Sequence, residues 1–339
     1  MKGVSVIVSN FNGAKYLPRL ISTLLKQECI DLELVIVDRN SSDESDEILA
    51  KNPSIKVVKY PPESGLVAGY TAGLSTATHD FIFFCNEDMW FDPQCLHKCM
   101  ELLLSSAQIG AVMPIQWTYD GIAIVNAGIW YQKMLWRRDS PVLTRGAQRH
   151  LVGHPAQLSF ANAGACLVKR EAFEAVGGWD NSFFLDCEDV DLGLRLWQHG
   201  WECWVAPDAT VGHAVGASNQ KVLPNTGSPV GRKRYVSSFS NFLMIALKYF
   251  SVTAIPRAFL AFGDVVLRDL VTGRWDRLLL DFKVVVLTLQ RAPDWLAWRK
   301  QHRQLNKMHP GEKFFFEPRF QYQAIGANRS NRTQIEPAG

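Results

Sequence analysis

Acidic side chains are concentrated at one point of the chain, between Asp186 and Asp191. Four carboxylates fall within these six residues, and the segment leads directly into an amphipathic helix. Each carboxylate gains only ~0.3–1 kcal/mol from the dipole at a helix start, whereas crowding raises the pKa of at least one of them. A carboxylate with a raised pKa suits general base catalysis. The segment is therefore a candidate catalytic site, and the alternative is an acidic turn that only caps the helix.

A second polar group, Asn86-Glu87-Asp88, follows an apolar strand. The preceding residues 81–84 are all apolar, so the strand ends where the polar residues begin. Asn86 and Asp88 are alternate residues and should point the same way. Their oxygens are hard ligands that suit Mg²⁺ or Mn²⁺ at about 2.0–2.2 Å. The pattern predicts a metal site, with a polar turn that binds no metal as the alternative.

Polar residues also follow the first two predicted strands. Asn10 and Asn12 come after residues 4–9, and Asp38 comes after residues 32–37. In open α/β sheets ligands bind at the carboxyl ends of the strands, so these side chains should share one rim. Asp38 could accept hydrogen bonds from a nucleotide base or ribose, or it could be an ordinary Asp in a strand-to-helix turn. No G-x-G-x-x-G fingerprint follows the first strand, which disfavours dinucleotide-dependent hydride transfer.

The elements that position these residues alternate between strands and helices. β-Branched runs predict strands, and the stretches between them predict helices. This alternation favours an open parallel α/β sheet. The expected strands are residues 4–9, 32–37, 55–60, 81–84, 109–114, 158–169 and 201–205, and the expected helices are residues 14–27, 42–50, 65–77, 92–105, 171–176 and 190–199.

The composition is that of a globular, cytosolic protein. Hydrophobic residues make up 47% of the 339 positions, which is enough for a full core. The seven Cys show no C-x-x-C pairing, so neither a disulfide framework nor a zinc site is expected. The first strand is too short for a signal peptide, and no apolar run approaches the ~18 residues of a membrane-spanning helix.

Charge is distributed unevenly. The net charge is +3, but residues 231–310 carry 14 Lys or Arg against 5 Asp or Glu, a balance of +9. Apolar residues between Phe239 and Phe250 recur at i, i+3, i+4, i+7 spacing. Basic, aromatic-rich helices suit an anionic membrane surface better than nucleic acid, for which no signature is found. We predict peripheral membrane attachment, with packing on protein or a solvated basic face as alternatives.

Six motifs carry a resemblance to a known family. They are Val4-Ser-Val-Ile-Val-Ser-Asn-Phe-Asn-Gly13, Val35-Ile-Val-Asp-Arg-Asn-Ser-Ser-Asp43, Phe84-Cys-Asn-Glu-Asp88, Gly177-Gly-Trp-Asp180, Phe184-Leu-Asp-Cys-Glu-Asp-Val-Asp-Leu192 and Val211-Gly-His213. In order and spacing they resemble the family 2 inverting glycosyltransferases, of the bacterial rhamnosyltransferase and galactofuranosyltransferase type, over about residues 1–215. The resemblance implies a GT-A fold, an open, mostly parallel nucleotide-binding sheet flanked by helices, followed here by a C-terminal helical region.

The resemblance also implies a role for each matched position. Asn86 and Asp88 match a metal-binding N-x-D or D-x-D signature, and His213 matches a histidine that completes the metal site. Asp189 matches the catalytic base, with Glu188 beside it. Glu188 and Asp191 would orient the acceptor or hold the helix. Residues implied at the nucleoside diphosphate sugar donor are Ser9, Asn10, Asn12, Asp38, Asn86 and Asp88, and those implied at the acceptor are Trp179, Asp180 and Asp191.

Several positions depart from the family's pattern. Arg39 stands where the family often has an acid or Asn, and three further positions stand where it has Asn: Glu63, Tyr70 and Thr71. These differences leave the identity of the donor open. Asn86 in place of Asp also weakens the charge compensation of a bound metal.

Residues and resemblance together predict an inverting sugar transferase. It would move a sugar from a nucleoside diphosphate sugar to a glycan or lipid-linked acceptor, in bacterial surface polysaccharide synthesis at the cytoplasmic face of the inner membrane. The alternatives are a nucleotidyltransferase and a catalytically degenerate glycan-binding or assembly protein on the same scaffold. The expected organisation is a catalytic domain at 1–215, a linker at 216–232, a basic amphipathic helical region at 233–310 and a tail at 311–339.

Overall fold

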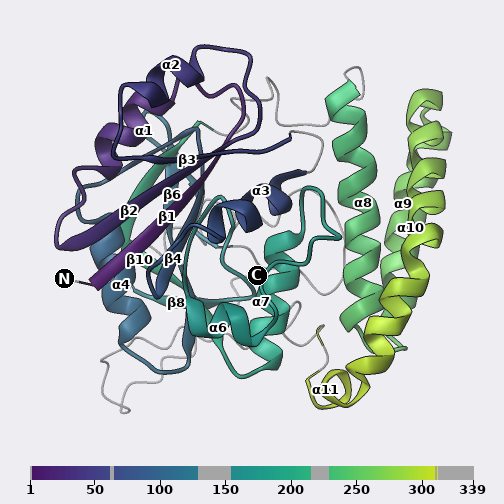
Figure 1. Ribbon diagram of the computed structural model, residues 1–339. Coiled ribbons are helices and arrows are strands. Elements are labelled where there is room, and N and C mark those ends of the chain that lie inside the picture. The colour runs from purple at the N-terminus through teal and green to yellow at the C-terminus, as the bar shows by residue number, and fades with distance from the viewer. Residues whose placement is uncertain (1, 62–64, 129–153, 215–228, 310, 312–339) are drawn as a thin grey trace.

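The computed structural model describes residues 2–61, 65–128, 154–214, 229–309 and 311. Figure 1 shows a central sheet covered by helices, with a stack of long helices beside it. The strands are β1 (Lys2–Asn10), β2 (Ile30–Asp38), β3 (Lys56–Lys59), β4 (Phe81–Asn86), β5 (Met89–Phe91), β6 (Ile109–Thr118), β7 (Ile124–Asn126), β8 (Ala156–Leu158), β9 (Ala165–Lys169) and β10 (Glu202–His213). The helices are α1 (Leu17–Leu24), α2 (Ser45–Ala50), α3 (Gly65–Leu74), α4 (Cys95–Leu104), α6 (Arg170–Ala175), α7 (Glu188–Gln198), α8 (Pro229–Tyr249), α9 (Ile255–Val271), α10 (Trp275–Gln301) and α11 (Arg303–Met308).

The sheet combines a parallel half with antiparallel additions. Its strand order is β3-β2-β1-β4-β9-β6-β10-β5, with β7 on β6 and β8 on β10. Strands β3, β2, β1 and β4 are all parallel, as expected, and β6 is parallel to β10. Strand β9 runs antiparallel between β4 and β6, and β5, β7 and β8 also pair antiparallel. The sheet as a whole is therefore mixed.

Two expected strands differ from what the structure shows. The strand expected at 158–169 is split into β8 and β9, and residues 159–164 between them form no strand. The strand expected at 201–205 extends to His213, with irregularities in its pairing to β6. Both differences matter for function, because residues 159–164 and the end of β10 carry side chains of the candidate site.

Each face of the sheet has its own apolar core. Side chains alternate along a strand, so Val4, Val6 and Val8 of β1 pack in the cluster that contains α1, α2 and α4. Ile7 points to the opposite face, into the cluster that contains α3, α6, α7 and α8. Helices α9 and α10 are the outermost elements on that side (Figure 1).

Helix α8 packs on protein rather than presenting its apolar face to a membrane, so the expectation for this helix is wrong. Phe239 is 9% exposed, and Leu243 and Phe250 are almost fully buried in the core shared with α7. The helix begins at Pro229, inside the expected linker, whose residues 216–228 lie outside the described part of the chain, as do residues 312–339 of the expected tail.

A buried ion cluster joins α8 to α7. Asp191 is fully buried and accepts hydrogen bonds from Arg195 Nε at 2.8 Å, from Lys248 Nζ at 2.6 Å and from the Tyr249 hydroxyl. Lys248 also donates to Asp180 at 2.8 Å. Buried charges are tolerated only when they are paired and hydrogen-bonded, so this cluster requires α8 to dock in one position.

Candidate functional site

The ends of β1, β2 and β4 bring the predicted donor residues to one rim. Asn10 pairs in register with Asp38 on β2, and Ser9 pairs with Asn86 on β4. Because the three strands are parallel neighbours, their carboxyl ends and the residues that follow them lie on the same edge of the sheet.

Asp38 organises this rim from a fully buried position. Its carboxylate accepts hydrogen bonds from Asn10 Nδ2 at 2.7 Å, Ser41 Oγ at 2.6 Å and Lys59 Nζ at 2.8 Å. Burial works to raise the pKa of Asp38, but the hydrogen bonds from Lys59, Ser41 and Asn10 lower it overall. Protein groups thus occupy both oxygens, and direct contact with a nucleotide base stays a prediction.

Asn12 ties the loop after β1 to the loop after β2. Its backbone has a φ of 54°, a left-handed conformation that Asn adopts more readily than most residues. Its Oδ1 accepts from the Ser42 backbone N–H at 2.8 Å, and its own N–H donates to Ser41 Oγ at 2.9 Å. Nearby, Asn10 Oδ1 is buried and has no hydrogen-bond partner in the described part of the chain.

Asp88 and His213 face each other at the opposite end of the site. Asp88 is 4% exposed, and His213 Nε2 lies 3.2 Å from its Oδ1. The two atoms are close but not aligned as a hydrogen bond, and within the described residues Oδ1 accepts none. Asn86 lies nearby, where its Oδ1 accepts from the Tyr70 hydroxyl at 3.3 Å.

A row of hydrogen-bonded side chains connects this pair to Asp189. Asn162 Nδ2 donates to Asp189 Oδ2 at 2.9 Å, and Gln116 Nε2 donates to Asn162 Oδ1 at 3.0 Å. Gln116 Oε1 lies 3.1 Å from His213 Nδ1. The structure therefore brings Asp189 and Asp88, a hundred positions apart in sequence, to the two ends of one continuous row.

The direction of the hydrogen bonds along this row determines which ring nitrogen of His213 carries a proton. An ionised Asp189 carboxylate can only accept, so the Asn162 amide donates to it, and the Asn162 carbonyl accepts from Gln116. Gln116 then presents its oxygen to His213 Nδ1, which must carry a proton. In a neutral His213, Nε2 is consequently an unprotonated nitrogen facing the carboxylate of Asp88.

Asp88 Oδ1 and His213 Nε2 together suit the coordination of a divalent cation. A buried carboxylate oxygen that accepts no hydrogen bond and an unprotonated imidazole nitrogen lie together, which is unfavourable unless a proton or a cation sits between them. The described residues contain no group of three or more His, Cys, Asp or Glu side chains that could hold a metal by themselves. Asp88 and His213, with the amide of Asn86 nearby, would hold the ion together with oxygens of a bound ligand.

Asp189 has the environment expected of a base. It is 8% exposed; Oδ2 also accepts from the Ala163 N–H at 3.3 Å, and Oδ1 accepts from the Val190 N–H at 2.9 Å. Burial raises the pKa of Asp189 to about 6, although those backbone hydrogen bonds act to lower it. A carboxylate with this pKa is ionised at neutral pH and is still a useful proton acceptor.

Glu188 is a different kind of carboxyl group. It is 6% exposed, and burial, followed by the charge of Asp189, raises the pKa of Glu188 well above its usual range. Its Oε2 accepts no hydrogen bond from the described residues. Of the two neighbouring carboxyl groups, Glu188 is thus the one whose charged form its surroundings disfavour most strongly, which favours Asp189 as the proton acceptor.

The loop before α7 is strained and is held by α8. Asp186 and Cys187 have φ values of 65° and 70°, which are costly for residues other than glycine. Arg234 of α8 donates two hydrogen bonds to the Asp186 carboxylate, at 3.0 and 2.9 Å. Asn241 Nδ2 donates to the carbonyls of Leu185 and Asp186 at 3.0 and 2.8 Å. Helix α8 thus holds the conformation that positions Asp189.

The residues predicted at the acceptor do not form an open site. Asp191 is buried in the ion cluster with α8, so of the two roles expected for it the structure supports holding the helix. Asp180 pairs with Lys248 in the same cluster. Trp179 is 6% exposed and packs against Phe84 and Phe173. Acceptor contacts from Trp179 or Asp191 would require rearrangement of well-packed side chains, whereas the side chain of Asp180 is 28% exposed.

Sequence patterns did not reveal Asn162 or Gln116. Asn162 lies within the segment that resembled a continuous strand, and Gln116 lies in the part of β6 beyond its expected end at residue 114. The available signal was the polar character of Gln116 and Asn162 among apolar neighbours. Lys59 and Arg234, which pair with Asp38 and Asp186, were missed because ion pairs between distant residues leave no local pattern.

Comparison with known proteins places the chain in a family. Residues 5–177, just over half of the chain, match the sequence model of Glycosyl transferase family 2. An uncharacterized glycosyltransferase, alr2836, from Nostoc sp. is 32% identical over 113 residues, which span 32% of this chain and 35% of that protein. An N-acetylglucosaminyl-diphospho-decaprenol L-rhamnosyltransferase from Mycobacterium tuberculosis is 24% identical over 246 residues, which span 61% of this chain and 75% of that protein.

A solved structure extends the likeness to the fold. The mannosyltransferase PcManGT from Pyrobaculum calidifontis, solved in complex with GDP-Man and Mn²⁺, matches with a TM-score of 0.52 at 16% identity, over 92% of this chain and 86% of that one. This likeness confirms the expected GT-A architecture, and the family match confirms the expected enzyme class. The chain belongs to glycosyl transferase family 2 and is a glycosyltransferase with a GT-A fold.

Proposed function

We propose that this glycosyltransferase moves a sugar, with inversion, from a nucleoside diphosphate sugar to a hydroxyl group of a glycan or lipid-linked acceptor in the synthesis of a bacterial surface polysaccharide. The observation that carries the proposal is the row from Asp189 through Asn162 and Gln116 to His213 and Asp88. It has a buried base at one end and a cation-binding pair at the other. Two similar proteins support the proposal: one is named as an N-acetylglucosaminyl-diphospho-decaprenol L-rhamnosyltransferase, and PcManGT was solved in complex with GDP-Man and Mn²⁺.

Asp189 is the proton acceptor in this reaction. As the acceptor hydroxyl oxygen forms its bond to the anomeric carbon, the bond from that carbon to the donor phosphate breaks and the hydroxyl proton passes to Asp189. Asn162 and the Ala163 N–H orient the carboxylate for this transfer. General base catalysis of this kind contributes about 10²–10⁴ in rate. A single displacement inverts the anomeric configuration without a covalent enzyme intermediate.

The cation site at Asp88 and His213 serves the departing diphosphate. Mg²⁺ or Mn²⁺ bound there would supply Lewis acid stabilisation of the negative charge that develops on the leaving group. Asn10 ends β1 and Asn12 lies in the loop that follows it, where the nucleoside of the donor would bind.

The donor test is a panel of nucleoside diphosphate sugars with Mn²⁺. We expect at least one donor to raise the melting temperature of the protein and to release nucleoside diphosphate slowly, because glycosyltransferases leak donor sugar to water. Release is measured with a coupled assay, with Mn²⁺ and with EDTA. A glycan-binding protein on a degenerate scaffold would release none. Absence of both stabilisation and release across the panel would reject the proposed reaction.

We also propose that the outer face of α9 and α10 attaches the enzyme peripherally to the cytoplasmic face of the inner membrane. No described helix is both long and apolar enough to cross a bilayer. These two helices nevertheless carry large apolar side chains that are 50–78% exposed: Leu260, Leu267, Leu270, Val271, Trp275, Leu279, Phe282 and Leu289. Basic residues lie among them, and such a surface binds where anionic headgroups meet acyl chains.

Replacing Leu279 and Phe282 together by Glu is expected to reduce vesicle binding by about tenfold or more, since each side chain gains roughly 1.5–3 kcal/mol when buried. The measurement is co-sedimentation with phosphatidylglycerol–phosphatidylcholine vesicles. Leu25 and Ile122 are exposed on the catalytic domain, so their double replacement by Glu is the matched control and should bind like the wild type. Equal binding of the two variants, or a wild type that forms dimers and ignores vesicles, would contradict membrane attachment.

A further inference from the structure

A cationic cavity lies between α8 and α10, apart from the donor rim. Its volume is about 720 Å³, and four of its ten lining residues are Lys or Arg, while none is acidic: Arg232, Lys233, Lys283 and Arg291. The remaining surface is largely apolar and includes Phe184, Leu280 and Leu287. A cavity with this lining attracts an anionic group and also accommodates an apolar one.

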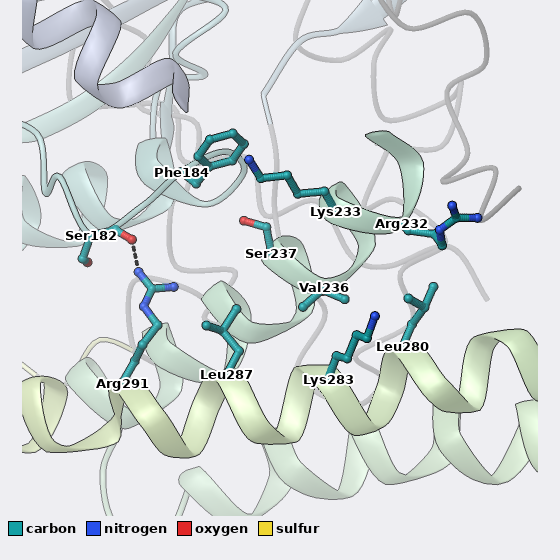
Figure 2. Close-up of a pocket in the computed structure, with 10 residues that line it drawn as sticks. All are labelled: Ser182, Phe184, Arg232, Lys233, Val236, Ser237, Leu280, Lys283, Leu287 and Arg291. Carbon is teal, nitrogen blue, oxygen red and sulfur yellow. Dashed lines mark hydrogen bonds between the residues drawn. The ribbon is translucent and has the colours of Figure 1, made fainter. Parts of the chain in front are cut away.

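Three of the four cations, Lys233, Lys283 and Arg291, lie around the space between α8 and α10. Figure 2 shows Lys283 and Arg291 extending from α10 toward α8, and Lys233 extending from α8 to Phe184. Lys233 Nζ lies 3.7 Å from the centre of the Phe184 ring. Arg291 donates to the Ser182 carbonyl and, at 3.1 Å, to Asn241 Oδ1. Lys283 makes no ion pair with the described residues. Its positive charge is thus available to a ligand.

The cavity adjoins both the catalytic loop and the apolar outer face. Phe184, in its lining, precedes Asp189 by five residues, and Ser237, also in the lining, donates to the carbonyl of Leu185 at 3.0 Å. On the other side, Lys283 follows the exposed Leu279 by one helical turn. A ligand in the cavity could therefore reach the catalytic loop at one end and the apolar face at the other.

We propose that this cavity binds the phosphate groups of an amphipathic acceptor, in which a sugar is joined through a diphosphate to a long apolar chain. The inference rests on the proposed function and specifies where its acceptor binds. The diphosphate lies among Lys233, Lys283 and Arg291, the sugar extends toward Asp189, and the chain leaves past Leu279 toward the membrane-facing surface. The donor diphosphate has a separate place, at the strand ends near Asp88.

The test measures binding of farnesyl diphosphate, a short diphosphate lipid, to the full chain by calorimetry. Inorganic pyrophosphate and farnesol are the comparison ligands, because they carry the anion alone and the chain alone. We expect farnesyl diphosphate to bind at least tenfold more tightly than either. The double variant Lys233→Gln/Lys283→Gln should lose about tenfold in affinity, since it removes two partly exposed charge contacts. The control Lys300→Gln/Lys307→Gln removes two exposed charges outside the cavity and should bind like the wild type.

Each outcome decides the inference. Equal affinity of the wild type and the cavity variant overturns it, and pyrophosphate binding as tight as farnesyl diphosphate overturns the amphipathic ligand in favour of a free anion. Should the double variant fail to fold, the exposed Lys283→Gln alone gives the same comparison. Donor release by the same proteins separates the two proposals: loss of lipid binding with donor release intact supports the cavity, whereas a wild type that releases no donor rejects the proposed function.

Discussion

Asp189→Asn is expected to reduce sugar transfer by about 10²–10⁴ while leaving donor affinity nearly unchanged. The amide cannot accept the hydroxyl proton, but it preserves the size and shape of the side chain. The hydrogen-bond donors at Asp189 Oδ2 are Asn162 and the Ala163 N–H. They bind an amide oxygen as well as a carboxylate oxygen. Rate and donor affinity should therefore separate, which initial-rate kinetics and calorimetric titration of the donor would measure.

Two further variants make this result specific. Asp208 is exposed on β10, so Asp208→Asn carries the same chemical change without reaching the site and should behave like the wild type. Glu188→Gln replaces a carboxyl group whose pKa is raised well above its usual range by burial and by the charge of Asp189, so its effect on transfer should be much smaller than that of Asp189→Asn. A comparable loss of donor affinity and rate in Asp189→Asn, or an equal loss of rate in Glu188→Gln, would reject Asp189 as the base.

The pH dependence gives an independent check on the same residue. Burial raises the pKa of Asp189 from its usual 3.8 to about 6, so the rate of transfer should rise with pH through about 6 and then level off. The effect on stability has the opposite sign. A raised folded-state pKa favours the protonated carboxyl, so this contribution is fully present below about pH 4 and is lost as the pH rises through about 6. Asp189→Asn should therefore be more stable than the wild type at neutral pH in urea unfolding.

The rim of the sheet was predictable because buried parallel strands leave a clear sequence pattern. The apolar runs before Asn10, Asp38 and Asn86 are short and rich in β-branched or aromatic residues, which favours strands, and parallel neighbours end on one edge. The register pairs Asn10 with Asp38 and Ser9 with Asn86, as that reasoning requires. Local pattern and topology together therefore predicted that these residues share one edge of the sheet.

Residues that act across long sequence distances were not predictable in the same way. The amphipathic pattern of α8 is the same whether the helix meets lipid or protein, and only the positions of Asp180 and Asp191 show that Lys248 must be buried. Asn162 lies in a loop whose apolar flanks resemble a strand. Its contact with Asp189 depends on how β9 inserts between β4 and β6, which no local pattern encodes.

Asp88→Ala is expected to weaken Mn²⁺-dependent donor binding by about 10–100-fold or more, the loss typical of damage to a metal site. Asp88 Oδ1 is the carboxylate oxygen that faces His213 Nε2. It accepts no hydrogen bond from the described residues. Without it, a cation retains the His213 nitrogen and the uncharged amide of Asn86. Removing the carboxylate therefore removes the negative charge that would hold the ion.

Titrating the donor in the presence of Mn²⁺ and again in EDTA isolates this effect. The wild type should bind the donor more tightly with Mn²⁺, whereas Asp88→Ala should bind it with the same low affinity under both conditions. Asp31→Ala, at an exposed position on β2, is the matched control and should respond to Mn²⁺ like the wild type. If Asp88→Ala kept a wild-type response to Mn²⁺, the cation would have to bind elsewhere. The contact between His213 and Asp88 would then have a structural role, with a proton on Nε2 pairing the two side chains.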